Sequence, residues 1–430
     1  MFCSIVTVES YFHNDLPGEK MELKNGRFEI QGVDLEKLCQ KYDSPLYIYD
    51  AQIMKKQVDT LLRGLSGVNC KIKYAMKALS NISVLKYLKT LGVGLDCVSI
   101  QEVRTGKMVG YHPSDILFTP NSISFEEIKE AVAERVVINI DNISILEQFG
   151  HEYGDQVECC IRLNPHIMAG GSVKISTGHI DSKFGISIYQ MRHLLRIIDN
   201  YKIKVIGIHV HTGSDILDIG AFLQGAEIIF DAAHSFKDLK FLDFGSGFKV
   251  PYQEGDISTD VSELGDQLAI RYKDFCIEYG KELEIWFEPG KFIVSESGIL
   301  VVRVNSLKTT PASVFAAVNS GLNHLIRPMM YDAHHEVVNL TNTEGHKRIY
   351  TVVGYICETD TFGSDRKLHD VREGDLLAIK NAGAYGMSMA SNYNSRLKPA
   401  EVMILDGEDH LIRRREELED LFPTQLEIEC

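Results

Sequence analysis

The sequence has no run of apolar residues that approaches the roughly 20 needed to cross a bilayer as a helix. Residues 1–17 include Glu9, His13 and Asp15, where a secretory leader would have a basic end followed by an apolar stretch. Basic residues are also in the minority, with 45 Lys and Arg against 60 Asp and Glu and a formal net charge of −15. That charge repels nucleic acid phosphate and anionic membrane surfaces. We therefore predict a cytoplasmic protein with no nucleic acid partner and no membrane partner.

Cysteine pairs of the kind that build disulfide frameworks or zinc sites are missing. The nine cysteines are an odd number, scattered along the chain, and no two of them form a Cys-x-x-Cys motif. Neither a disulfide framework nor a structural zinc site is therefore indicated, and we predict no bound metal. Cys159 and Cys160 are adjacent in a strand-like segment, so their side chains should point to opposite faces. Most of the cysteines are expected to be small core residues.

The chain length and composition are those of a soluble globular protein with two domains: 430 residues, 44% hydrophobic and 24% charged. Between residues 71 and 290, short β-rich runs alternate with segments of helical periodicity, such as 125–135, 188–200, 221–236 and 263–279. Eight such units are the content of a (β/α)8 barrel of the TIM type, whose active site lies at the carboxyl ends of the strands. The eight strands are expected at residues 71–76, 94–99, 115–120, 136–140, 158–164, 204–212, 241–247 and 284–290.

After residue 297 the pattern changes to short Val- and Ile-rich strands separated by turn residues, a pattern typical of a separate β domain. These strands are expected at 298–304, 313–318, 348–356, 375–380 and 399–405, and residues 27–31 have the same character. We predict an α/β protein with a barrel domain of residues 44–297. A β domain, of the sandwich or barrel kind, would comprise residues 298–430 and be completed by the N-terminal segment 1–43.

Charged residues, histidines and glycines gather at the carboxyl ends of the predicted barrel strands. Lys77 follows the first strand, and an amine at the mouth of a barrel is placed to form a Schiff base, which suggests pyridoxal 5'-phosphate. Glycines let backbone N–H groups approach a phosphate closely because no Cβ intrudes. Each motif taken singly has an ordinary structural explanation, but their shared position favours one site. The three later strands end in His209-Val210-His211-Thr212-Gly213-Ser214, Asp243-Phe244-Gly245-Ser246-Gly247 and Glu288-Pro289-Gly290-Lys291.

Several motifs, in order along the chain, together resemble a known family. They are Tyr74-Ala75-Met76-Lys77, His211-Thr212-Gly213-Ser214, Gly245-Ser246-Gly247, Glu288-Pro289-Gly290, Asn323-His324-Leu325-Ile326-Arg327-Pro328, Tyr331-Asp332-Ala333, Cys357-Glu358, Asn381-Ala382-Gly383-Ala384-Tyr385-Gly386 and Ser391-Asn392-Tyr393-Asn394. The chain resembles the alanine-racemase-fold pyridoxal phosphate decarboxylases of basic amino acids over roughly residues 45–405, and most of all the diaminopimelate decarboxylases among them. This resemblance implies conversion of meso-2,6-diaminopimelate to L-lysine and carbon dioxide, the last step of lysine biosynthesis.

The resemblance implies a role for each matching residue. Lys77 would hold the cofactor covalently, His211 would stack on its ring, and Glu288 would pair with the pyridine nitrogen, which favours the protonated ring. The phosphate would contact Ser214, Gly245, Gly247, Gly290 and Tyr385.

In this family a cysteine from the neighbouring subunit is thought to return a proton to the substrate carbon, and Cys357 matches it. We therefore expect a homodimer with shared active sites. Glu358 would meet the distal ammonium of the substrate. Its distal carboxylate would bind in a pocket that includes Arg327, Tyr331, Lys291 and Tyr385.

Three positions depart from the family pattern. Lys291 stands where the family has arginine, Ser246 replaces the middle glycine of the phosphate loop, and Asn319 replaces an aspartate. A lysine offers a point charge where arginine offers a planar fork, so the anion contact at Lys291 should be looser. None of the three removes a group that bond breaking requires, so they bear on affinity and substrate and leave the reaction class unchanged.

Other functions stay open on the residues alone. A polyamine-pathway decarboxylase of the same fold would act on ornithine, lysine or carboxynorspermidine. An amino acid racemase would need a second base, usually a tyrosine of the partner subunit, where this chain has Cys357 and Glu358. A non-catalytic cofactor-binding protein of this fold typically lacks the β domain, and inactive homologues usually lose the lysine or the cysteine.

Overall fold

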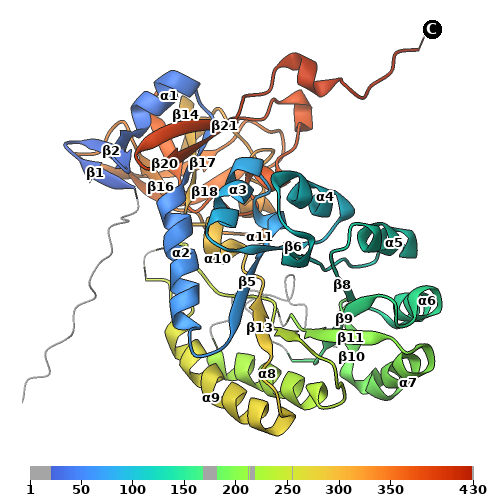
Figure 1. Ribbon diagram of the computed structural model, residues 1–430. Coiled ribbons are helices and arrows are strands. Elements are labelled where there is room, and N and C mark those ends of the chain that lie inside the picture. Colours follow the sequence, from blue (N-terminus) through green and yellow to red (C-terminus); the bar gives the residue numbers. More distant parts are fainter. Residues whose placement is uncertain (1–20, 168–181, 212, 214–217, 254, 429–430) are drawn as a thin grey trace, which may run out of the picture.

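Eight parallel strands close into a barrel in this computed structural model, which describes residues 21–167, 182–211, 213, 218–253 and 255–428. Each strand pairs with the next, and the last pairs with the first (Figure 1). The predicted (β/α)8 barrel is confirmed. Its strands are β5 (Cys70–Ala75), β6 (Gly94–Cys97), β7 (Ile116–Phe118), β8 (Val137–Ile140), β9 (Glu158–Asn164), β11 (Lys204–His209), β12 (Phe241–Asp243) and β13 (Glu284–Phe287).

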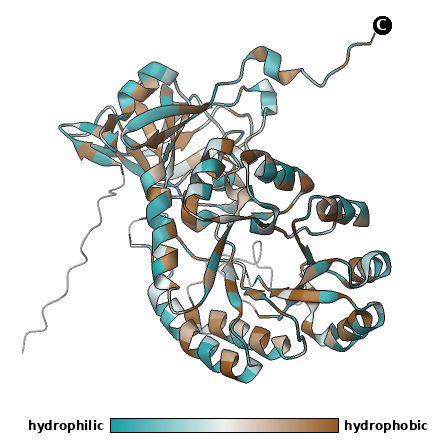
Figure 2. Cartoon of the chain, viewed as in Figure 1, coloured by the Kyte–Doolittle hydropathy of each residue, from teal (hydrophilic) through white to brown (hydrophobic). Residues whose placement is uncertain are grey.

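Helices alternate with these strands and surround the barrel, and hydrophilic residues colour much of their outer faces (Figure 2). Polar residues begin many of them: Asn81, Ser99, Asn142, Asp218 and Asp260 each accept a hydrogen bond from a backbone N–H in the first turn. None of the helices in the described part of the chain has both the length and the apolar character that crossing a membrane requires. The helices are α3 (Ile82–Thr90), α4 (Ile100–Val109), α5 (Phe125–Ala133), α6 (Ile143–Tyr153), α7 (Met191–Tyr201), α8 (Ile219–Ala233), α9 (Val261–Tyr279) and α10 (Lys291–Val294).

Side chains inside the barrel form a floor below the strand ends. Phe241 and Trp286 stack with their ring centroids 3.6 Å apart, and Gly207 makes room, since a Cβ there would lie 2.2 Å from the Phe241 ring. Because strand side chains alternate, Asp243 and Glu288, two residues further along their strands, follow on the same inner side. The carboxylates therefore sit above a packed aromatic layer.

The adjacent cysteines of β9 confirm this alternation. Cys159 belongs to the main hydrophobic core outside the barrel strands, whereas Cys160 belongs to the inner cluster that contains Phe241 and Trp286. Both cysteines are fully buried. Their opposite orientations, predicted from the sequence, leave them unable to act as a pair.

The separate β domain is also confirmed. Its sheet has the order β18-β17-β15-β14-β4-β20-β21, with β19 paired to β14 and β16 paired to β19. The N-terminal hairpin strands and helix α1 (Leu35–Tyr42) pack against this sheet through a second hydrophobic cluster. The strands are β1 (Glu22–Lys24), β2 (Arg27–Ile30), β3 (Val33–Asp34), β4 (Leu46–Asp50), β14 (Gly298–Thr309), β15 (Val314–Val318), β16 (Val337–Asn339), β17 (Lys347–Val353), β18 (Thr361–His369), β19 (Leu376–Ile379), β20 (Ala400–Leu405) and β21 (Glu408–Arg413).

Strand β4 bears on where the two domains divide. It pairs antiparallel with β14 and in parallel with β20, so its hydrogen bonds join the β sheet rather than the barrel. Helix α2 (Ala51–Gly64) then leads from β4 to the first barrel strand. The domain limits, 44–297 for the barrel and 1–43 with 298–430 for the β domain, stay a prediction. They assign β4 to the barrel domain, although its hydrogen bonds are to strands of the β sheet.

Some elements differ from the sequence-based expectation. The predicted strands 204–212 and 241–247 end earlier, at His209 and Asp243, because the glycine-containing loops that follow turn away; Gly245 has a φ of +61° and Gly247 one of +151°. Strands β16, β18 and β21 had not been expected. β18 and β21 carry many exposed charged residues, so they have no apolar pattern from which a strand could be predicted. They are strands because each forms backbone hydrogen bonds with a neighbouring strand.

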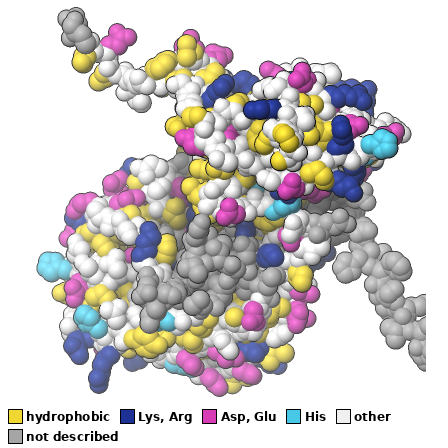
Figure 3. Space-filling model, turned by 180° about the vertical axis from the view of Figure 1, so that it is seen from behind, with side chains coloured by type: hydrophobic (Ala, Val, Ile, Leu, Met, Phe, Trp, Pro, Cys, Tyr) yellow, Lys and Arg dark blue, Asp and Glu magenta, His cyan; other side chains and the backbone are white. Residues whose placement is uncertain are grey.

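The β domain covers the barrel mouth on one side. The backbone N–H of Tyr385 donates to the carbonyl of Ala78 at 2.9 Å, next to Lys77. The Asn381 side chain donates to the carbonyl of Pro251, on the loop after β12, at 2.8 Å. Seen from behind, the β domain forms a lobe above the barrel lobe (Figure 3). Residues of both domains therefore meet around the strand ends.

Candidate active site

Lys77 lies at the end of the first barrel strand, in a short 3-10 helix at Met76–Ala78. Its two neighbours are buried, whereas its own side chain is 45% exposed, standing in the barrel mouth. The amine Nζ is 3.4 Å from Oδ2 of Asp96, a buried carboxylate at the end of β6. The other Asp96 oxygen accepts a hydrogen bond from the Thr119 hydroxyl. An acid from the neighbouring strand thus orients the lysine amine.

The charges around Lys77 favour its protonated form. Burial alone would lower the pKa of Lys77, but the nearby Asp96, Tyr385 and Glu288 together raise it above the usual range for lysine. The ammonium is therefore the resting state of this side chain in the protein without a bound partner. A carbonyl compound that condenses with Lys77 must displace this ion pair with Asp96.

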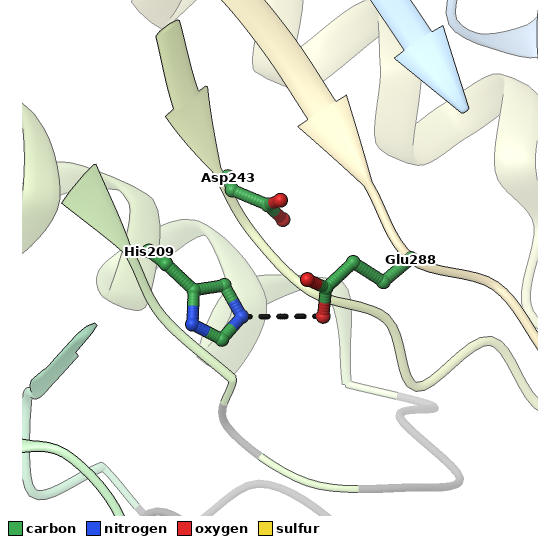
Figure 4. A group of neighbouring side chains, drawn as sticks. All are labelled: His209, Asp243 and Glu288. Carbon is green, nitrogen blue, oxygen red and sulfur yellow. Dashed lines mark hydrogen bonds and ion pairs between the residues drawn. The ribbon is translucent and has the colours of Figure 1, made fainter. Parts of the chain in front are cut away.

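His209, Asp243 and Glu288 lie together at the ends of three neighbouring strands, and their side chains turn toward one another (Figure 4). His209 Nε2 is 3.2 Å from Glu288 Oε2, and the Asn139 amide is 2.9 Å from His209 Nδ1. Burial and the charge of Arg162 hold the pKa of His209 far below its usual value, so the ring is neutral. With the amide donating to Nδ1, the ring donates from Nε2 to Glu288.

Asp243 and Glu288 are neighbouring buried carboxylates. Oδ2 of Asp243 and Oε1 of Glu288 are buried and have no hydrogen-bonding partner among the described residues. Burial raises the pKa of both groups, and the charge of Glu288 raises that of Asp243 further, whereas Lys77 and Arg162 lower that of Glu288. We infer that Asp243 keeps the proton and Glu288 carries the charge. Glu288 then presents a buried anionic carboxylate beside a neutral Asp243.

Gly245 and Gly290, which follow the barrel strands β12 and β13, pack closely against neighbouring residues. A Cβ at Gly245 would lie 2.6 Å from Nδ1 of His211, and the backbone there is in the left-handed region, which glycine adopts without strain. His211 Nδ1 accepts a hydrogen bond from the Ser246 backbone at 3.2 Å. A Cβ at Gly290 would lie 3.1 Å from the Cβ atoms of Ala75 and Ala78, on either side of Lys77. The loops therefore form a close cradle around His211 and Lys77.

His211 is a neutral ring at the barrel mouth. Burial, followed by the charges of Arg162 and Lys77, holds its pKa far below the usual value. A neutral imidazole can lie face to face with another aromatic ring without adding charge to the site. Gly247 follows in the same loop, whereas Ser214 and Thr212 lie outside the described residues.

The residues predicted to bind the substrate carboxylate come from both domains. Lys291 begins α10 directly after the eighth strand end, and Arg327 and Tyr331 lie one turn apart on α11 (Arg327–Tyr331). Arg327 is 8% exposed, and its Nε has no partner among the described residues. Its guanidinium carbon lies 5.0 Å from the centre of the Tyr252 ring. Tyr331 is 40% exposed.

Cys357 and Glu358 lie apart from this cluster, at the exposed surface of the β domain. The Cys357 sulfur is 3.5 Å from Glu358 Oε2 and 3.6 Å from the Asn394 amide, and the Tyr393 hydroxyl donates to Glu358 Oε1 at 2.5 Å. That hydrogen bond from Tyr393 lowers the pKa of Glu358. Within the described part of the chain, neither side chain makes a hydrogen bond or ion pair with a barrel residue.

Comparison with known proteins places the chain in a family. Residues 51–295, more than half of the chain, match the family described as "Pyridoxal-dependent decarboxylase, pyridoxal binding domain". The diaminopimelate decarboxylase of Methanothermobacter thermautotrophicus is 35% identical over 410 residues, which cover 93% of this chain and 96% of that enzyme. The chain belongs to the pyridoxal-dependent decarboxylase family.

Solved structures of this decarboxylase family share the fold. The crystal structure of diaminopimelate decarboxylase from M. jannaschii is 30% identical, with a TM-score of 0.87 over 96% of this chain and 98% of that chain. A structure of the same enzyme in complex with L-lysine has a TM-score of 0.86 at 29% identity, over 96% of this chain and 99% of that chain. The similarity therefore extends over both domains of the decarboxylase and is not confined to the barrel.

The site residues fit the cofactor for which the decarboxylase family is named. A ring nitrogen that must stay protonated needs an anionic acceptor, and Glu288 has a buried oxygen without a partner. A phosphate needs a cradle free of Cβ atoms, and a Cβ at Gly245 would fill the space against His211. Lys77 and Glu288 stand at the ends of β5 and β13, which are hydrogen-bonded neighbours.

Several residues of the site had not been singled out from the sequence. Asp96 follows no motif, and only its place at the end of the second strand could have indicated it. His209 and Asp243 lie inside motifs that had been noted for their neighbours, His211 and Gly245. Asn139, Arg162 and Tyr252 have no signal in the sequence, because their roles depend on the closure of the barrel and on the approach of the β domain.

Proposed function

We propose that the protein binds pyridoxal 5'-phosphate and converts meso-2,6-diaminopimelate to L-lysine and carbon dioxide. One observation carries the proposal: a lysine amine and an unpartnered, buried glutamate oxygen stand at the ends of adjacent barrel strands. Adjacent strands are about 4.8 Å apart, so one aromatic ring can reach both groups. The family membership and the similarity to diaminopimelate decarboxylases support the same reaction.

When bound, the cofactor supplies an electron sink for the electron pair left behind by the departing carboxylate. In the proposed complex Lys77 holds it covalently, and Glu288 keeps its ring nitrogen protonated. His211 lies against the ring, and the phosphate is held by Ser214, Gly245, Gly247, Gly290 and Tyr385. The protein's part in the reaction is then to orient the scissile bond and to maintain these charges.

The proposed substrate has an ammonium and a carboxylate on its distal carbon. Arg327 offers a buried guanidinium with an unpartnered Nε, suited to bidentate pairing with that carboxylate. Tyr331, Lys291 and Tyr385 complete the proposed pocket, and Glu358 receives the distal ammonium. Ornithine has no distal carboxylate and would leave Arg327 unpaired, so the arginine favours diaminopimelate.

A substrate panel tests this proposal. With added pyridoxal 5'-phosphate, the protein should release carbon dioxide and L-lysine in equal amounts from meso-diaminopimelate. It should release carbon dioxide from ornithine more slowly. An Arg327→Met variant should raise KM for diaminopimelate about 10²-fold, because the substrate carboxylate loses its charged partner. Arg348→Met, a change at an exposed arginine of β17, is the matched control and should leave KM unchanged. Faster decarboxylation of ornithine, lysine or carboxynorspermidine, or α-hydrogen exchange without carbon dioxide, would contradict the proposal.

We also propose a homodimer in which Cys357 and Glu358 of each chain complete the site of the other. Their exposure and their lack of bonds to the barrel support this arrangement, since a proton donor must reach the substrate carbon at the barrel mouth. In it, the Cys357 thiol returns the proton after carbon dioxide leaves. A single chain would then hold Lys77 but no complete site.

Mixing two inactive variants tests the shared site. Lys77→Ala and Cys357→Ala homodimers should each be nearly inactive. After dissociation and random reassociation, half of the dimers are mixed, and each mixed dimer has one intact site. Activity should therefore recover to about a quarter of the unaltered value. No recovery, with mixed dimers shown to be present by mass spectrometry, would place Lys77 and Cys357 in the same chain's site.

A further inference from the structure

We infer that Tyr252 is a positioning residue, whose ring holds the Arg327 guanidinium open for a substrate carboxylate. Tyr252 follows β12 in the barrel, whereas Arg327 begins α11 in the β domain. The inference deepens the proposed function and depends on it, because it concerns recognition of the distal carboxylate in the same site.

Arg327 is unusual among buried arginines in having no acidic partner. Among the described residues, no hydrogen bond or ion pair reaches its guanidinium, and its Nε is buried and unpaired. Buried charges are normally paired, because removing them from water is costly. The aromatic face of Tyr252, 5.0 Å from the guanidinium carbon, supplies a cation–π contact in place of a carboxylate.

The Tyr252 ring is itself held from several sides. Its hydroxyl is 3.0 Å from Oγ of Ser295, and its backbone N–H donates to Asp256 at 3.0 Å. The His335 ring packs against it edge to face, with centroids 5.6 Å apart and planes at 85°. Burial lowers the pKa of His335 to about 3, so this neighbour adds no charge. The ring therefore offers Arg327 a fixed surface.

A second cation approaches the same ring. Nζ of Lys291 lies 6.0 Å from the Tyr252 ring centre. Lys291 and Arg327 are the two charged residues proposed for the substrate carboxylate, and they come from different domains. The Tyr252 ring therefore lies close to both cations that are proposed to meet the distal carboxylate.

The Tyr252 ring orients the Arg327 guanidinium without neutralising its charge. A protein carboxylate beside Arg327 would fix its direction but would also compete with the substrate for the same N–H donors. The Tyr252 ring fixes the direction and leaves the planar fork of donors unoccupied. Substrates with a distal carboxylate should therefore depend on Tyr252, and substrates without one should not.

Two variants of the holoenzyme separate the ring from the hydroxyl. Tyr252→Leu should raise KM for meso-diaminopimelate about 10-fold and change kcat less than about 3-fold, since the contact affects binding of a remote group. Tyr252→Phe keeps the ring and should restore KM to within about 2-fold. KM for L-ornithine should be the same in all three proteins. If Tyr252→Leu does not fold, as judged by its melting temperature, Tyr252→Met takes its place.

Binding of pimelate, a dicarboxylate that cannot be decarboxylated in this way, provides a readout independent of turnover. By calorimetry its Kd should rise about 10-fold in Tyr252→Leu and stay near the unaltered value in Tyr252→Phe. A holoenzyme that forms no lysine but shows this pimelate pattern would overturn the proposed reaction and keep the inference. An active holoenzyme in which Tyr252→Leu changes neither KM nor pimelate binding, or in which Tyr252→Phe is as impaired as Tyr252→Leu, would overturn the inference alone.

Discussion

A Lys77→Ala variant is expected to form lysine from meso-diaminopimelate at least about 10⁴-fold more slowly than the unaltered protein. The reason is the position of Lys77 at the barrel mouth, 3.4 Å from Asp96 and on the strand next to that of Glu288. Without its amine the site loses the group that is proposed to bind the cofactor covalently and to release it to the substrate. The measurements are lysine formation and the visible absorbance band of the lysine-bound cofactor, which should disappear.

Lys73 provides the matched control for this experiment. It lies on the same strand, buried inside the barrel, with its amine 4.3 Å from the centre of the Trp286 ring, and burial lowers its pKa to about 8. Lys73→Met should lower the melting temperature but keep the absorbance band. If borohydride reduction still attached the cofactor covalently to the Lys77→Ala protein, the assignment of Lys77 would be wrong.

Much of the barrel could be predicted because each of its strands is a short apolar run that is followed by turn residues or by polar residues. The polar residues that follow those strands, such as Lys77, His211 and Glu288, could be identified for the same reason. The hydrophobic pattern does not predict strands that lack apolar residues. Charged strands such as β18 and β21 are recognisable only through their hydrogen-bonded neighbours. Strand β4 lies beside β14 and β20, which are more than 200 residues away in sequence.

The supporting residues of the site were harder to predict for a related reason. Asp96, Asn139 and Asp243 come from different strands, and their partners depend on which strands lie side by side in the closed barrel. Tyr252 meets Arg327 only because the two domains pack together. Local motifs therefore identify groups that act on a ligand, whereas the groups that set their charge and direction depend on tertiary contacts.

Charged groups of both signs lie close together in the site. Lys77 and Arg162 face the carboxylates of Asp96 and Glu288, and Arg162 also lies 4.7 Å from the centre of the Phe184 ring. Burial lowers the pKa of Arg162, against the charge of Glu288, which raises it. With Asp243 protonated, Lys77 and Arg162 face the charges of Asp96 and Glu288, and Asp141 adds a further carboxylate near Arg162. A protonated ring nitrogen beside Glu288 would add one positive charge, and a phosphate would add negative charge at the glycine loops.

A Glu288→Gln variant is expected to lower kcat about 10³-fold while KM changes little, because the amide cannot hold a ring nitrogen in its protonated form. Glutamine keeps the size of the side chain and can still accept the hydrogen bond from His209, 3.2 Å away in the unaltered protein. The cofactor should therefore stay bound. The absorbance band should persist with an altered maximum, measured beside steady-state kinetics of lysine formation.

Asp243→Asn is the control that tests the proton assignment. If Asp243 carries the proton, asparagine replaces one neutral group with another. Its side chain still accepts the hydrogen bond from the Gly245 backbone N–H, which is 2.8 Å long in the unaltered protein. It also still offers a donor on the side of Glu288. Its kcat should fall less than about 10-fold. Equal losses in Glu288→Gln and Asp243→Asn would show that both carboxylates are charged in the working enzyme. A loss confined to Asp243→Asn would move the anionic partner of the ring nitrogen from Glu288 to Asp243.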